Sequence, residues 1–200
     1  MGLTTRDLEL IRYLEKNFIL NAQIASRLIY WTRNEKSSLN VAHKRTQEII
    51  KHQKQVHRVR EYVGQSYIYY IGKNPTKTKH RLMMTDFLSR MKVDGFEIIL
   101  DETEVEYKKL EERYHIRPDM LVTFKYGDET YCALVEIDLT KPFTNTDAYN
   151  RLYNDLKAGR YKMQHPMCLV SVCEKKPDIG CIWIKPDWSN FSNLKYTFIR

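Results

Sequence analysis

Two consecutive runs of strand-forming residues, DMLVTFKYG and ETYCALVEID, constrain the fold of this 200-residue chain more than any other stretch. They meet at Gly127-Asp128, and a Gly-Asp pair between two such runs predicts a tight antiparallel hairpin. Three further strand-like runs, at 95–102, 167–173 and 180–185, are separated from the hairpin by helical patterns at 103–116 and 145–162. This β-α-β-β-α-β-β order predicts an α/β (α+β) domain over residues 95–200, with helices packed on a central mixed sheet.

The first 74 residues have a different pattern. Apolar residues at helical spacing follow Thr4, Asn21 and Ser37-Ser38, which predicts three helices, and Thr4 with Asp7 resembles a capping box. Two β-favouring runs then flank Gly64-Gln65 and predict a hairpin. Three helices followed by a hairpin is the order of a winged helix-turn-helix, in which the third helix lies in the major groove of DNA. Residues 75–94 are expected to be a linker with a connecting helix.

The distribution of charge favours a polyanionic partner for this first part. The chain has a net charge of +8, yet residues 1–100 contain 18 Lys and Arg against 9 Asp and Glu, whereas residues 101–200 contain 15 against 16. A basic module joined to a neutral domain is typical of proteins that bind nucleic acid. A solvated basic surface, or an adaptor that binds an acidic partner, gives the same count.

The residues expected to contact double-stranded DNA lie on the third helix and the hairpin. Lys44 or Arg45 would pair with guanine and Gln47 with adenine, because their donors and acceptors match those base edges. Arg58 and Arg60 on the hairpin would hold phosphates, which positions the protein without specifying sequence. The full predicted set is Lys36, His43, Lys44, Arg45, Gln47, Lys51, Arg58 and Arg60.

Three carboxylates in the second half form a candidate metal site. Glu136 and Asp138 are two residues apart in a strand and therefore project from one face, and Asp119 begins the neighbouring strand. Oxygen ligands of this kind suit Mg²⁺, and a bound Mg²⁺ would activate water and neutralise charge on a scissile phosphate. The sequence therefore predicts Asp119, Glu136 and Asp138 as metal ligands and catalytic residues.

Pro118-Asp119, the hairpin and Glu136-Ile137-Asp138 resemble the PD-(D/E)xK core of restriction-endonuclease-like proteins. Together with the first 74 residues, nearly the whole chain is similar to the replication-relaxation family of plasmids and mobile elements. The resemblance implies a DNA-binding protein that acts in replication, DNA relaxation or transcriptional control. Asp138 stands where active nucleases usually have lysine, so Lys141 or Lys157 would have to supply the amine. An inactive or weakly active nuclease-like domain is therefore expected, with a Mg²⁺-dependent endonuclease and a protein-interaction adaptor as alternatives.

No apolar run reaches the 18 to 20 residues that span a bilayer, and the N-terminal stretch is too charged for a signal peptide. We therefore expect a cytoplasmic protein with no membrane partner. Mg²⁺ is the only cofactor that the residues suggest. A homodimer joined through the helix at 80–91 is a further hypothesis.

Overall fold

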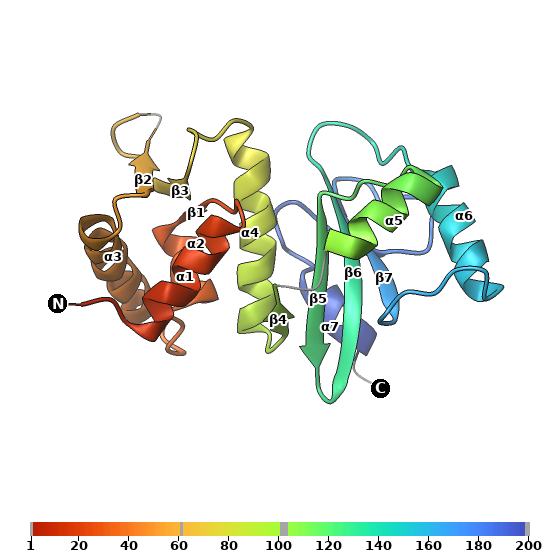
Figure 1. Ribbon diagram of the computed structural model, residues 1–200, viewed down its shortest axis with the longest axis horizontal. Coiled ribbons are helices and arrows are strands. Elements are labelled where there is room, and N and C mark those ends of the chain that lie inside the picture. The colour runs from red at the N-terminus through yellow and green to blue at the C-terminus, as the bar shows by residue number, and fades with distance from the viewer. Residues whose placement is uncertain (1, 61, 101–103, 199–200) are drawn as a thin grey trace. The chain divides into compact units, whose positions relative to one another are not determined.

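The computed structural model describes residues 2–60, 62–100 and 104–198, and the chain divides into two compact units, Met1–Asp94 and Gly95–Arg200 (Figure 1). Within the described ranges it is a mixed α+β protein with seven helices and two sheets, in agreement with the predicted class. The boundary follows the helix at residues 78–93, so that helix belongs to the first unit.

The first unit combines four helices with a small antiparallel sheet. Its strands lie in the order β1-β3-β2, so the first strand of the unit pairs with the last. The elements are α1 (Thr5–Glu15), β1 (Leu20–Asn21), α2 (Ala22–Leu28), α3 (Glu35–His52), β2 (Val56–Val59), β3 (Ile68–Ile71) and α4 (Thr78–Val93).

Side chains at the N-termini determine where the first three helices begin. The capping box at Thr4 and Asp7 is confirmed: the Asp7 amide donates to Thr4 Oγ1, and the Thr4 amide donates to Asp7 Oδ2 at 2.6 Å. Asn21 caps α2 as predicted, because its Oδ1 accepts the Ile24 amide at 2.8 Å. The expected start of the third helix at Ser37-Ser38 is wrong, because Asn34 accepts the Ser37 amide at 2.9 Å and starts α3 at Glu35.

Helix α4, at the position expected for a connecting helix, packs on α2 within the first unit. Arg27 of α2 forms an ion pair with Asp86 of α4, and Arg27 Nε also donates to Ser89 Oγ at 3.2 Å. Lys92 reaches back to Glu9 of α1 at 2.7 Å. These polar contacts fix α4 along the first unit.

The second unit is built on a five-stranded mixed sheet in the order β4-β5-β6-β7-β8. The expected hairpin is present: β5 and β6 pair antiparallel and turn at Gly127, whose φ of 63° lies in the left-handed region that glycine tolerates. Strands β6, β7 and β8 run parallel, and α6 makes the crossover from β6 to β7. The elements are β4 (Glu97–Ile99), α5 (Glu104–Tyr114), β5 (Met120–Tyr126), β6 (Glu129–Asp138), α6 (Thr146–Lys157), β7 (Met167–Cys173), β8 (Ile182–Ile184) and α7 (Ser192–Phe198).

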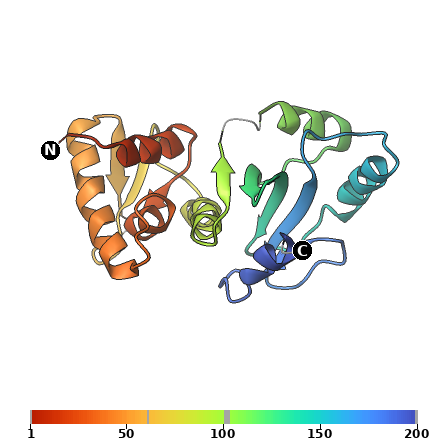
Figure 2. The same cartoon turned by 90° about the horizontal axis from the view of Figure 1, so that it is seen from below.

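Helices cover both faces of this sheet (Figure 2). On one face, Leu110 of α5 and Leu152 of α6 are fully buried against Leu121 and Leu134 of the hairpin. On the other, Phe198 of α7 contacts the ring of Phe124 at 5.4 Å between centroids. Carboxylates that share the first face are therefore placed beneath α5 and α6.

Candidate nucleic-acid interface and carboxylate site

Five of the predicted DNA contacts are exposed along one face of α3: Lys36, His43, Lys44, Gln47 and Lys51. A helix advances 100° per residue, so these positions form a stripe about 100° wide along its length. Asn40 is also exposed within this stripe, and its amide is a base-reading group that we did not predict. Asn40 lies four residues from both Lys36 and Lys44, and this spacing in the sequence places it on the same face of a helix.

Arg45 does not belong to this stripe, and its predicted role in pairing with guanine is wrong. It lies nine residues after Lys36, which places it on the opposite side of the helix. Its side chain is 9% exposed, and its guanidinium forms an ion pair with Asp7 of α1 and donates to the Gly2 carbonyl at 3.0 Å. Arg45 therefore joins α3 to α1 rather than reaching a groove.

Asp7 is the buried acceptor that holds Arg45. The side chain of Asp7 is fully buried, and it also accepts the Tyr30 hydroxyl at 2.7 Å. Burial alone would raise the pKa of Asp7, but the hydrogen bonds from Arg45, from Thr4 and from Tyr30 outweigh burial and lower it to about 2. Asp7 is therefore ionised at neutral pH.

The hairpin between β2 and β3 carries the other two predicted arginines. Arg58 and Arg60 are both exposed, and their guanidinium carbons lie 4.3 and 5.0 Å from the centroid of the Tyr67 ring. A guanidinium stacked on an aromatic ring keeps its outward N–H donors free for phosphate. In the connecting loop, Tyr62 is 63% and Val63 85% exposed, which is unusual for apolar side chains.

In the second unit, the strand register brings Asp119 and Glu136 together. Met120 pairs with Val135, so the next pair along the hairpin is Asp119 and Glu136, on the face beneath α5 and α6. Asp119 Oδ2 accepts the Ile137 amide at 2.8 Å. Glu136 is 7% exposed, and its Oε1 accepts the Tyr149 hydroxyl at 2.8 Å and the Asn145 amide at 3.5 Å.

The surroundings of Glu136 favour its neutral form. Burial raises the pKa of Glu136 and the nearby charges of Asp119 and Asp138 raise it further, whereas the hydrogen bond from Tyr149 opposes the rise, and the result is about 7. Burial, together with the charges of Asp119 and Glu136, also raises the pKa of the Tyr107 hydroxyl. This is the electrostatic setting of a protonatable carboxyl beside a carboxylate.

The remaining predicted catalytic residues of the second unit are Asp138, Lys141 and Lys157. Asp138 is half-buried one step further along β6, and no group of three His, Cys, Asp or Glu side chains among the described residues is placed to hold a metal ion. Lys141 is exposed in the loop after β6. Lys157 is exposed eight residues after Tyr149, about 12 Å further along α6. We derive no catalytic step from these residues.

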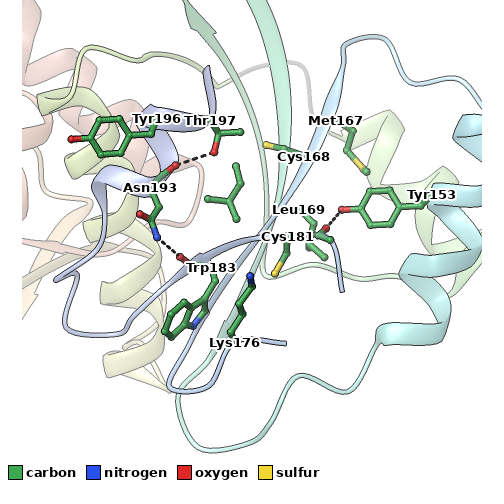
Figure 3. A pocket seen from close by; sticks show the side chains of 12 residues that line it. Tyr153, Met167, Cys168, Leu169, Lys176, Cys181, Trp183, Asn193, Tyr196 and Thr197 are labelled. Atoms are coloured by element: carbon green, nitrogen blue, oxygen red, sulfur yellow. Dashed lines mark hydrogen bonds between the residues drawn. The ribbon is translucent and has the colours of Figure 1, made fainter. Parts of the chain in front are cut away.

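An open cavity of about 630 Å³ in the second unit contains none of the predicted site residues (Figure 3). Two of its polar side chains bond to carbonyls in its wall: the Tyr153 hydroxyl donates to the Gly180 carbonyl at 2.7 Å, and Asn193 Nδ2 donates to the Trp183 carbonyl at 3.3 Å. Burial raises the pKa of the Cys168 thiol in its wall to about 12, so that thiol is neutral. We therefore assign no chemistry to this cavity.

Comparison with protein-family models, with curated proteins and with solved structures finds no match to this chain. Among the described residues, none of the helices combines the length and the apolar character needed to cross a membrane.

Proposed function

We propose that this chain binds double-stranded DNA through its first unit, with α3 in the major groove and the β2–β3 hairpin on the adjoining backbone. The observation that carries the proposal is the exposed stripe of polar and basic side chains along α3, which is opposite the buried Arg45. A helix of this diameter fits the major groove, and the stripe combines phosphate-binding lysines with the base-reading amides of Asn40 and Gln47.

The order of elements supports a winged helix-turn-helix as the fold of this unit. Three helices, α1 to α3, precede the β2–β3 hairpin, and β1 closes the sheet beside β3. In that arrangement the hairpin is the wing, and Arg58 and Arg60 stacked on Tyr67 are its phosphate contacts. The exposed Tyr62 and Val63 at its tip suit the minor groove, where apolar side chains contact sugars and base steps.

The second unit is proposed to be a nuclease-like domain with little or no catalytic activity. Its support is the position of Asp119 opposite Glu136 on a hairpin, as in the PD-(D/E)xK pattern, together with Asp138 in place of the usual lysine. On this basis the chain would be a member of the replication-relaxation family, acting in the replication or transcriptional control of a plasmid or mobile element. The unit would then position the DNA-binding unit rather than cut DNA.

A selection from random duplex DNA, followed by anisotropy titrations across salt concentrations, tests the DNA proposal. The full chain should enrich a defined sequence, and its affinity should fall steeply with salt because bound phosphates release counterions. Gln47→Ala should lose about 1–3 kcal/mol of binding free energy on the selected sequence and almost none on unrelated duplex DNA. Lys51→Ala should weaken binding to the selected and to the unrelated duplex alike, and should reduce the slope of log affinity against log salt by about 1.

Lys162→Ala is the matched control, because this exposed lysine lies in the second unit. The proposal is wrong if no sequence is enriched, or if Gln47→Ala and Lys51→Ala bind as the unaltered chain does. Equal affinity for duplex DNA and for an unrelated polyanion such as heparin would favour an acidic protein partner instead.

Conversion of supercoiled plasmid to nicked circles in the presence of Mg²⁺ tests the second unit. We expect no nicking above the background of an Asp119→Ala preparation, because Asp138 stands where active nucleases of this pattern usually have lysine. Nicking that disappears with Asp119→Ala would instead establish a Mg²⁺-dependent endonuclease.

A further inference from the structure

A hollow of about 310 Å³ between α5 and α6 of the second unit contains an unusual density of arginine. Its lining is Arg113, Tyr114, Arg151, Asn154, Asp155 and Arg160. Three guanidiniums face one carboxylate, so the lining has an excess of two positive charges. Residues 95–200 contain 15 Lys and Arg against 17 Asp and Glu, so this excess is local rather than a property of the unit.

Asp155 holds two of the arginines in place. Its Oδ2 accepts from an Nη of Arg113 at 3.0 Å and from the Tyr114 hydroxyl at 2.9 Å, and its Oδ1 accepts from Arg160 Nε at 2.8 Å. These bonds, first that of Arg160, lower the pKa of Asp155, so the carboxylate stays ionised at neutral pH. One carboxylate therefore orients two guanidiniums but balances only one of their charges.

Two further features concern how Arg113 and Arg151 present their N–H donors to the hollow. The Arg113 guanidinium carbon lies 5.4 Å from the ring centroids of both Tyr114 and Tyr161, and these contacts favour its present placement beside the hollow. Arg151 is exposed one helical turn before Asp155, and it makes no ion pair within the described residues. The C-terminal end of α6 adds a partial negative charge of about half an electron, which reduces the excess of two without cancelling it.

We propose that this arginine hollow binds a phosphate group, supplied by the backbone of nucleic acid. Planar guanidiniums match phosphate oxygens with paired N–H donors, and arginines held by bonds within the protein lose little freedom when they bind. Three arginines among the six lining residues suit an anion rather than an uncharged ligand. The hollow is separate from the α3 stripe, and only its assignment to nucleic acid rests on the proposed function.

Titration of the full chain with inorganic phosphate at pH 7 tests the site itself, with chloride at matched ionic strength as the reference. Arginine Nε–H resonances in ¹⁵N-labelled protein should shift saturably for Arg113, Arg151 and Arg160. Arg151→Ala should lower the affinity for phosphate roughly tenfold, the loss expected for one charge-assisted contact. Arg117→Ala is the matched control, because Arg117 is an exposed arginine of the same unit outside the hollow. Absence of saturable shifts, or equal phosphate affinity of Arg151→Ala and the unaltered chain, overturns the proposal.

Binding to non-specific duplex DNA tests the source of the phosphate. Arg151→Ala should reduce the slope of log affinity against log salt by about 1, whereas Arg117→Ala should leave the slope unchanged. Phosphate binding without any change of slope in Arg151→Ala overturns the assignment to nucleic acid. Failure of the α3 proposal is recognised separately, because it appears as unchanged sequence preference in Gln47→Ala whatever Arg151→Ala does.

Discussion

A buried ion pair joins the first and third helices of the DNA-binding unit, and its two residues are not interchangeable with surface charges. Arg45→Ala would leave Asp7 buried and charged without its main partner, so we expect a loss of about 3–5 kcal/mol in the free energy of unfolding. Lys44→Ala, the exposed neighbour on the same helix, should change it by less than about 0.5 kcal/mol. Urea unfolding at pH 7 measures both.

The low pKa of Asp7 also makes the stability contributed by this ion pair depend on pH. Asp7 has a folded pKa of about 2, below its ordinary 3.8. The stability that ionised Asp7 gives to the folded state is therefore complete above pH 4 and is lost as the pH falls through 2. A difference of this size corresponds to about 2 kcal/mol. Equal stabilities of Arg45→Ala and Lys44→Ala at pH 7 would show that the pair contributes nothing.

Glu136 should show the opposite pH dependence. Its folded pKa of about 7 lies above the ordinary 4.5, so between these values the unfolded chain has lost a proton that the folded chain retains. Stability should therefore fall across this window as the pH rises, by up to about 3 kcal/mol. In Glu136→Gln this part of the decline should be missing, since an amide does not titrate. Unfolding between pH 4.5 and 8 tests this, with the exposed Glu112→Gln as control, and parallel curves for all three proteins would contradict it.

At the level of single residues, the sequence identified exposed positions better than buried ones. Helical period was sufficient to place Gln47 and Lys51 on one face, whereas Lys36 precedes the start that we predicted at Ser37-Ser38. We assigned Arg45 to the polar face, although it lies three residues after Ala42 of the apolar face and is buried there. Its partner Asp7 is 38 residues earlier, and no local pattern joins the two. Asp119 and Glu136 were paired correctly because the Gly127 turn fixes the register, whereas the hydrogen bonds from Tyr149 and Asn145 depend on how α6 packs.

Among the elements, the start of α3 decides which residues the stripe contains. Asn34→Ala removes the side chain that accepts a hydrogen bond from the Ser37 amide, and we expect the free energy of unfolding to fall by about 1 kcal/mol. Asn40→Ala makes the same substitution at an exposed mid-helix position, where alanine is the better helix former, so stability should stay equal or rise slightly. Thermal unfolding compares the two, and similar midpoints would show that Asn34 is not a stabilising cap.

The elements that sequence reasoning missed are the short ones. Strand β1 has two residues and exists only because Leu20 and Asn21 pair with Tyr69 and Ile68, which are almost fifty residues later. Helix α7 is held by Leu194 and by the ring of Phe198 against the sheet, and seven residues give too short a period to recognise. Long-range pairing, rather than local preference, determines such elements.

On the scale of the whole molecule, the two units divide the charge even more sharply than the two halves of the sequence. Residues 1–94 contain 18 Lys and Arg against 8 Asp and Glu, whereas residues 95–200 contain 15 against 17. Long-range attraction to DNA should therefore come almost entirely from the first unit, and the arginine hollow should add a short-range contact. The predicted hairpin and central mixed sheet are both present in the second unit, but no pattern in the sequence revealed that Arg113 and Arg160 would share Asp155.

A fragment of residues 1–94 separates these contributions. The fragment has its own sheet and helices, so we expect it to unfold cooperatively and to select the same DNA sequence as the full chain. Its salt slope should be smaller by about 1, because it lacks the arginine hollow and keeps the α3 stripe and the hairpin arginines. Circular dichroism and anisotropy titrations measure these quantities, with residues 95–200 as the comparison fragment. A folded 1–94 fragment without sequence preference would place the reading of DNA outside α3, since every residue of the stripe is still present in it.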